Sequence, residues 1–86
     1  MITITLVKFR HRPTKEEIEK APQAIQEAGA KIISSYWTLG RYDAVVTVEA
    51  PDERVAMQGL SKLLDAAATE TLVAIPREEA LKLAGY

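Results

Sequence analysis

The chain contains no cysteine and a single histidine among its 86 residues. Without cysteine there are no disulfides, no zinc sites with cysteine ligands and no thiol catalysis. One histidine also excludes a multi-histidine metal site within a single chain, and we expect neither a metal nor another cofactor. Asparagine, a thermolabile residue, is absent as well, which hints at a thermophilic source.

A surplus of basic residues is also missing, because 11 Lys and Arg stand against 12 Asp and Glu, for a net charge of -1. This balance gives no support to binding of nucleic acid or of an anionic membrane. No apolar run approaches the ~20 residues of a membrane span. The N-terminus begins directly with an alternating strand pattern and lacks the features of a signal peptide. We therefore expect a cytoplasmic protein with no nucleic-acid or membrane partner.

What is present is the composition of an ordinary globular domain, 48% hydrophobic and 27% charged. The length suits one domain, so residues 1–86 are interpreted as a single unit. A core of this size usually supplies only about 3–5 kcal/mol. Since disulfides and metals are excluded, oligomerisation is the remaining source of added stability. We expect a homodimer or a higher even oligomer.

Apolar side chains at alternating positions predict strands over residues 2–9, 31–38, 42–50 and 70–75. A helix is predicted from Thr14 to Ala28, because Thr14 and Glu17 form a capping box and Gly29 is a natural C-terminal stop. Pro22 lies inside this helix and should kink it or divide it in two.

A second helix follows Asp52, whose side chain can cap it. Its apolar stripe extends from Val55 to Ala67, and a short last helix is expected over residues 77–84. The order is therefore βαββαβ with a helical tail. Right-handed crossovers give an α+β, ferredoxin-like fold, a four-stranded antiparallel sheet with both main helices on one face.

This arrangement leaves the other sheet face bare. We expect the helices to cover Ile4, Leu6, Ala44, Val46 and Val48. The bare face would then carry Thr3, Thr5, Val7, Phe9, Val45, Thr47 and Trp37. Such a mixture is too apolar for solvent and too polar for a dry core. It suits a subunit interface that encloses a small, partly wet cavity.

Nearly the whole chain resembles the GYD-domain family, which is named for a Gly-x-Tyr-Asp motif, here Gly40, Tyr42 and Asp43. The matching segments are Ile4–Phe9, Tyr36–Val46, Glu49–Asp52 and Thr69–Leu72. Pro22 departs from the family pattern. Family members are small prokaryotic proteins similar to the dimeric α/β-barrel superfamily, in which two ferredoxin-like sheets pack face to face. The resemblance therefore implies this fold and a dimer, and it implies no particular reaction.

The motif residues and nearby aromatics are the first group of candidate ligand-binding residues. Gly40 most simply permits a positive φ in a turn. Asp43 either accepts hydrogen bonds from loop N–H groups or points from the bare face toward a ligand. Tyr36, Trp37 and Tyr42 could line a pocket, and aromatic residues at strand spacing are more often core or interface. We expect Tyr42 to point into the helix-covered core and Asp43 toward the partner sheet or its rim.

The second group is a basic cluster, Lys8, Arg10, His11 and Arg12, just before the first helix. A helix N-terminus favours anions, so a small organic anion or phosphate is a candidate ligand. A solvated loop is the alternative interpretation.

Three functions fit these features. The first is a small-molecule-binding or regulatory module. The second is an enzyme similar to the cofactorless monooxygenases or isomerases of the barrel superfamily, although the haem-degrading version needs an asparagine that this chain lacks. The third is a structural subunit of a larger assembly. No catalytic residue can be named from the sequence.

Overall fold

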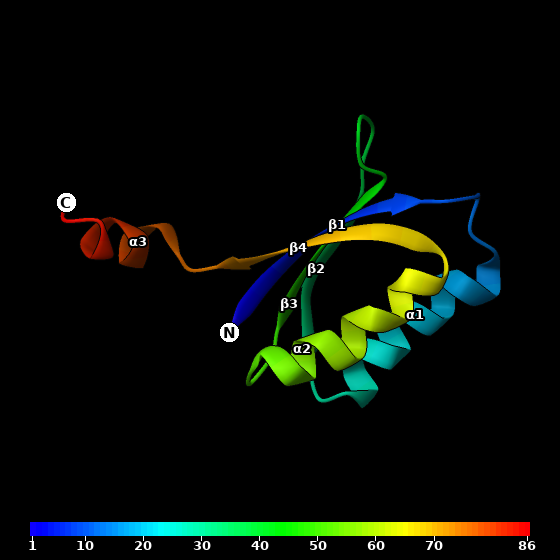
Figure 1. Ribbon diagram of the computed structural model, residues 1–86, viewed down its shortest axis with the longest axis horizontal. Helices are drawn as coiled ribbons and strands as arrows, with labels where there is room; N and C mark the ends of the chain where they lie inside the picture. Colours follow the sequence, from blue (N-terminus) through cyan, green and yellow to red (C-terminus); the bar gives the residue numbers. More distant parts are fainter.

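Four antiparallel strands with two helices on one side make up the body of the chain (Figure 1). The computed structural model describes all residues from Met1 to Tyr86. The elements in chain order are β1 (Ile2–Phe9), α1 (Lys15–Glu27), β2 (Lys31–Trp37), β3 (Ala44–Glu49), α2 (Glu53–Leu60), the 3-10 helix η1 (Ser61–Asp65), β4 (Ala67–Ala74) and α3 (Arg77–Leu83). The strand order β2-β3-β1-β4 confirms the predicted ferredoxin-like α+β fold.

The first helix begins where its capping residues place it. The backbone N–H of Glu17 donates to Thr14 Oγ1 at 3.2 Å, and the N–H of Thr14 donates to Glu17 Oε1 at 3.0 Å. The helix is continuous across Pro22, so the expected division in two does not occur. Pro22 removes only one backbone donor from the helix. Ile25, which is buried in the core, still anchors the same helix.

The second helical segment differs more from its prediction. Asp52 caps α2 as expected, since the Val55 N–H donates to its Oδ1 at 3.0 Å. After Leu60 the chain tightens into η1, and Ala67 is the first residue of β4, not the end of a helical stripe. Ala67 pairs with Phe9 and is buried. A small apolar residue fits both a helical stripe and a buried strand end, which is why periodicity misassigned it.

The predicted faces are right for β3 and wrong for β1. In the β1–β3 register, Thr3, Thr5 and Val7 lie opposite Val48, Val46 and Ala44. Opposed residues of an antiparallel pair share a face, so the helices cover the threonine-bearing side of β1. Phe9 and Trp37 also lie on this side, because Phe9 pairs with Ala67 and Trp37 with Ala44. The open face carries Ile2, Ile4, Leu6, Val45 and Thr47 instead.

This register places polar groups in the core and leaves the more apolar half of β1 outside it. Thr3 and Thr5 are only 2% and 0% exposed. The hydroxyl of Thr5 is hydrogen-bonded to that of Thr71 at 2.9 Å, whereas Thr3 Oγ1 has no partner. Hydrophobicity alone favours the opposite choice, because burying a hydroxyl costs free energy that burying an isoleucine does not. The apolar open face therefore needs a separate explanation.

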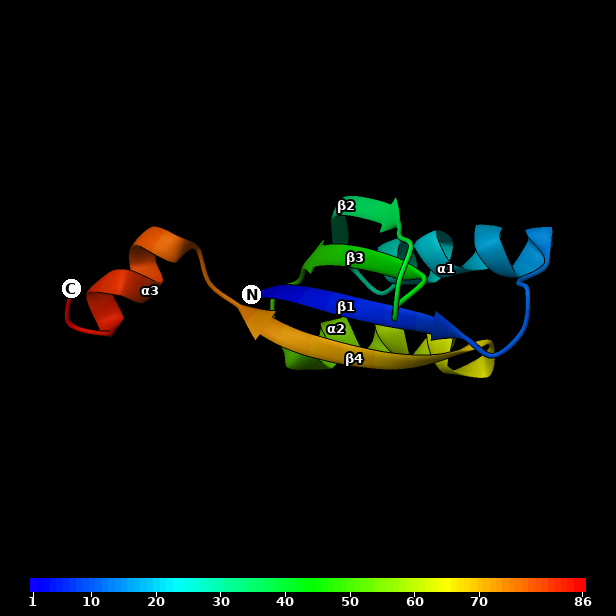
Figure 2. The same cartoon turned by 90° about the horizontal axis from the view of Figure 1, so that it is seen from above.

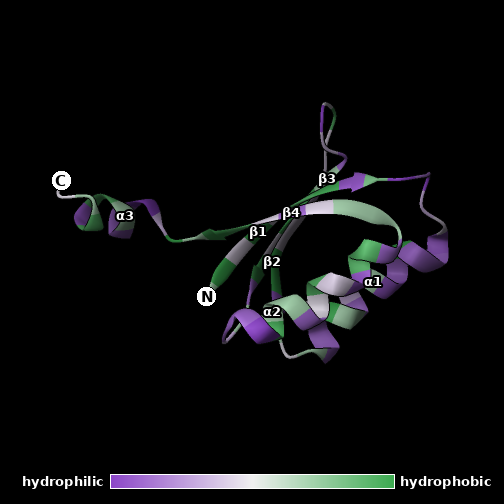
Figure 3. Ribbon diagram, viewed as in Figure 1, coloured by the Kyte–Doolittle hydropathy of each residue, from purple (hydrophilic) through white to green (hydrophobic).

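Figure 2 looks onto the open face of the sheet, with α1 and α2 behind the strands and α3 well beyond their end. Apolar residues concentrate along the strands, and polar residues cover much of α1 (Figure 3). The core centres on Val48, Ile25, Ala56 and Leu60, between β3 and the two helices. None of the helices combines the length and apolar character needed to cross a bilayer.

Candidate functional site

A cavity of about 680 Å³ lies between α1, η1 and the helix-facing side of the sheet. Apolar side chains from the sheet, α1 and η1 form most of its walls, including Val7, Phe9, Trp37, Ala44 and Val46 from the strands, Ile18, Ala21 and Ile25 from α1, and Leu63 from η1. It is therefore on the opposite side of the sheet from the cavity between subunits that the sequence led us to expect. We call it the helix–sheet pocket.

An aromatic pair stands at one end of this pocket. The ring centroids of Phe9 and Trp37 are 5.3 Å apart and the rings are inclined by 52°, which is a favourable tilted arrangement. Trp37 is nevertheless 63% exposed. The same two residues also border a shallower outer hollow, which is lined in addition by His11, Arg12, Pro13, Thr38 and Asp43. The aromatic pair thus joins the pocket to a polar entrance.

Charged groups occupy the rim of the helix–sheet pocket and leave its interior apolar. Lys20 and Lys62 line it beside the carboxylates Glu17, Glu27 and Asp65. Lys20 is paired with Glu16 one turn earlier at 3.0 Å, with both side chains largely exposed. An apolar interior with a few polar groups at its edge is typical of a small-molecule site.

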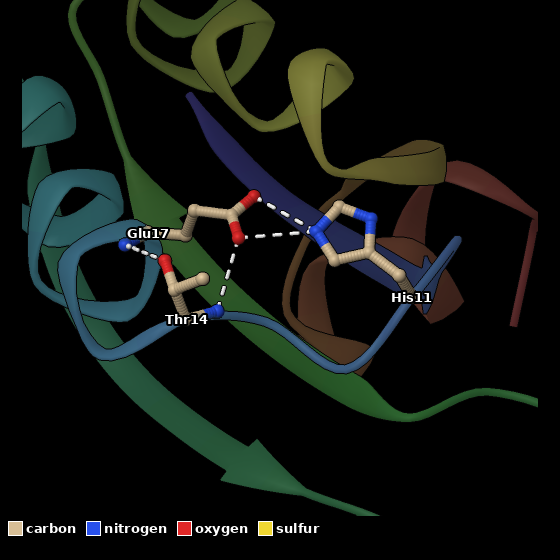
Figure 4. A network of polar contacts seen from close by, with 3 residues as sticks. All are labelled: His11, Thr14 and Glu17. Carbon is tan, nitrogen blue, oxygen red and sulfur yellow. Dashed lines mark hydrogen bonds and ion pairs between the residues drawn. The ribbon is translucent and has the colours of Figure 1, made fainter.

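His11 lies in the loop before α1 and contacts the first turn of that helix (Figure 4). Its Nε2 lies 3.1 and 3.2 Å from the two carboxylate oxygens of Glu17, which also accepts from the Thr14 backbone. The Thr14 backbone hydrogen bond, followed by the one to His11, lowers the pKa of Glu17 below its ordinary 4.5. Glu17 therefore links the polar entrance to the pocket rim.

The basic cluster is not presented to solvent as a single anion site. Lys8 Nζ pairs with Asp43 Oδ1 at 3.3 Å, and Arg10 Nη1 donates to the Leu64 carbonyl at 2.6 Å. Only His11 and Arg12 reach the outer hollow. The guanidinium of Arg12 is exposed and makes no hydrogen bond or ion pair.

The family motif closes the hairpin between β2 and β3. Gly40 has φ +124° at its tip, the conformation that the sequence suggested. The Thr38 N–H donates to the Asp43 carbonyl and the Asp43 N–H donates to the Val7 carbonyl, each at 2.8 Å. The Asp43 carboxylate accepts from the Phe9 N–H at 2.9 Å. Asp43 thus ties the hairpin to the end of β1, which carries Phe9.

Tyr42 does not enter the core, and that prediction was wrong. Its hydroxyl donates to Glu70 Oε2 at 2.8 Å, and this hydrogen bond raises the pKa of the phenol above 10.0. Glu70 lies opposite Leu6 on the open face. The alternation argument fails because β3 begins only at Ala44, so Tyr42 is in an irregular segment. Tyr36, opposite Val45, is also on the open face and is largely exposed.

Of the aromatic and basic candidates, the structure therefore brings Trp37, Asp43, His11 and Arg12 together around the outer hollow. Tyr36, Tyr42 and Arg10 lie elsewhere. Sequence reasoning missed the pocket residues of α1 and Phe9. The helical spacing of Ile18, Ala21 and Ile25 does mark one face of α1, but no sequence pattern shows that this face stands away from the sheet and leaves a cavity.

Fold and pocket together define the class, small proteins of ferredoxin-like fold with an apolar pocket between helices and sheet. Within that class, the model of the GYD domain matches residues 8–84, and the chain belongs to the GYD-domain family. The resemblance carried by Gly40, Tyr42 and Asp43 is thereby confirmed.

Solved structures support the same fold. TTHA0845 from Thermus thermophilus is 27% identical, with 88% of this chain and 98% of that one covered and a TM-score of 0.53. FFRP-DM1 is 22% identical, with coverages of 87% and 100% and a TM-score of 0.60. The hypothetical protein PHS023 from Pyrococcus horikoshii is 20% identical, with coverages of 92% and 95% and a TM-score of 0.58. No curated protein matches the chain.

Proposed function

We propose that this protein is a small-molecule-binding module that acts as a homodimer, and that its ligand occupies the helix–sheet pocket. The observation that carries the proposal is the pocket itself. Its volume of about 680 Å³ falls within the roughly 300–1,000 Å³ of typical ligand sites. Its walls are mainly apolar and its charges lie at the rim.

The lining favours a flat, apolar ligand that carries one anionic group. Phe9 and Trp37 offer ring faces and edges at the entrance, and aromatic ligands pack well on such pairs. Arg12 is exposed beside them without a protein acceptor, and a guanidinium binds carboxylates and phosphates in a bidentate manner. A small organic anion with an apolar body meets both requirements.

The homodimer is proposed from the register of β1. A lone monomer would gain by burying Ile2, Ile4 and Leu6 in place of Thr3 and Thr5. The observed register puts the isoleucines and Leu6 on the open face, half-buried, beside Val45. The free energy of this register is favourable if the open face is buried as well, against the same face of a second copy.

The pocket can be tested with anilinonaphthalene sulfonate, an apolar aromatic probe with one negative charge. We expect saturable binding of one probe per chain, accompanied by a change in the emission of Trp37, the only tryptophan. Ala21→Phe, which fills the pocket from α1, should weaken binding at least about tenfold, equivalent to ~1.4 kcal/mol.

Gln26→Phe is the matched control, since Gln26 is an exposed residue of the same helix outside the pocket lining. It should bind the probe as the unmodified chain does. Equal affinity in both variants would place the probe somewhere other than the pocket and contradict the proposal.

A further inference from the structure

The last residues of the chain form an arm that the body does not hold. This C-terminal arm, residues 75–86, contains α3 and extends past the end of the sheet (Figure 1). Its backbone hydrogen bonds are local, such as Ala84 N–H to the Ala80 carbonyl and Tyr86 N–H to the Leu81 carbonyl. No side-chain hydrogen bond or ion pair joins it to the body, and α3 packs extensively against no other element.

The arm exposes apolar side chains that a solvated helix would not need. Leu83 and Tyr86 are 74% and 91% exposed, and Ile75 is also among the exposed large apolar residues. A helix of 7 residues is well below the ~12–15 residues at which isolated helices become even marginally stable. The helix therefore needs packing that its own chain does not provide. The family match extends to residue 84, so α3 is part of the shared domain.

We infer that the C-terminal arm packs against a second copy of this chain, at the margin of that copy's open sheet face, and that it completes the dimer on which this inference rests. The arm continues directly from β4. Leu72 and Ala74 lie on the open face, opposite Ile4 and Ile2, so the arm begins directly beyond the end of this face.

The area of the open face supports packing of the arm against a second copy. Four strands of 6–8 residues, at about 4.8 Å between strands and 3.3 Å per residue, cover roughly 400–500 Å² in plan. A standard interface buries about 800 Å² on each partner. Protruding side chains make the accessible area larger than this plan area. Even so, the four strands alone would bury an area only in the lower part of the range usual for interfaces. Two arms, one from each copy, add the missing surface.

The geometry also argues against the arm folding back on its own body. Only Ile75 and Pro76 connect β4 to α3, and the proline is extended with φ -56° and ψ 145°. This short, stiff connection directs α3 away from both α1 and α2 (Figure 2). A second copy related by a two-fold axis receives the arm and returns its own, so no other partner is required.

The test compares the full chain with a chain lacking residues 76–86, by sedimentation velocity over a concentration series. We expect the full chain to be a dimer at micromolar concentration and the shortened chain to dissociate at least about tenfold more readily. The shortened chain should keep its circular dichroism, corrected for the lost helix, and should still bind anilinonaphthalene sulfonate in the helix–sheet pocket.

A pair of point variants in the full chain controls for misfolding of the shortened one. Leu83→Gln removes an exposed apolar group of the arm and should weaken the dimer, whereas Lys82→Gln, its neighbour, should not. If Leu83→Gln and the shortened chain both dimerise as tightly as the parent, the arm inference is overturned and the sheet-face dimer stands. If the full chain is itself a monomer, the dimer of the proposed function fails and the arm inference fails with it. Probe binding reports on the pocket separately.

Discussion

At the scale of single residues, Glu17 joins the most separate parts of the site. It caps α1 through the Thr14 backbone, holds the ring of His11 and lines the pocket rim. All three contacts favour or tolerate its charged form. Its carboxylate therefore orders the entrance loop at neutral pH and does so without any buried ion pair.

The pH dependence of stability tests this role. Because the folded state lowers the pKa of Glu17, its contribution is fully present above the ordinary value of 4.5 and is lost as pH falls through the lower, folded value. Glu17→Gln should thus be less stable than the parent at neutral pH, and the difference should shrink in acid. Urea midpoints measured across acidic and neutral pH give the comparison.

Glu16→Gln is the natural control, because Glu16 makes only an exposed pair with Lys20 on the same helix. Its effect should be small, since exposed pairs of this kind contribute about 0.3–0.5 kcal/mol. An equal loss of stability in both variants at neutral pH would show that the net charge of the helix, not the capping contact of Glu17, is responsible for the effect.

At the scale of elements, the close approach of α1 and α2 depends on Gly59. A Cβ at this position would lie 3.0 Å from the Cα of Ile25, a backbone atom. Relief would require the two helices to separate, and Ile25 is the most buried residue of α1. The side of α1 toward α2 is therefore packed tightly, whereas its side toward the sheet lines the pocket.

Gly59→Val should destabilise the chain by about 1–3 kcal/mol, the usual cost of overpacking. Chemical denaturation followed by circular dichroism measures this loss. Gln58→Val, at the exposed neighbouring position of the same helix, carries the same β-branched penalty without the clash and should cost well under 1 kcal/mol. Comparable losses at the two positions would mean that the helices can separate freely.

Elements that depend on local chemistry could be predicted from the sequence. Thr14, Glu17 and Asp52 start the helices where expected, and Gly40 adopts its positive φ at the hairpin tip. Features that depend on tertiary structure, such as which side of β1 is buried, could not be predicted in this way. Both alternating sets of β1 are apolar enough to be buried, and the structure buries the less apolar one, with Thr3 and Thr5. The pocket was missed for the same reason, since it arises from how far α1 stands from the sheet.

At the scale of the whole molecule, the open face is the surface on which the proposed homodimer depends. Leu6 lies at its centre, opposite Val45 on one side and Glu70 on the other. Leu6→Asp would bury an unpaired charge in the dimer and is expected to raise the dissociation constant at least about tenfold, since an uncompensated buried charge costs several kcal/mol. Sedimentation equilibrium provides the measurement.

Met57→Asp is a suitable comparison, because Met57 is exposed on α2, in the helical layer on the other side of the sheet. It should leave the dimer intact. A Leu6→Asp chain that remains folded and dimerises normally would show that the copies meet on some other surface.

The alternation of β3 has a consequence for insertions and deletions. Val46 faces the helix–sheet pocket, and its neighbour Val45 faces the open side. Because successive side chains of a strand point to opposite faces, one residue added to or removed from β3 would exchange the two sets along its length. Such a change would bring Thr47 and Glu49 inward and disturb both surfaces at once. A change of two residues would keep every side chain on its own side, so length variation in this strand should occur in even steps or be confined to the hairpin around Gly40.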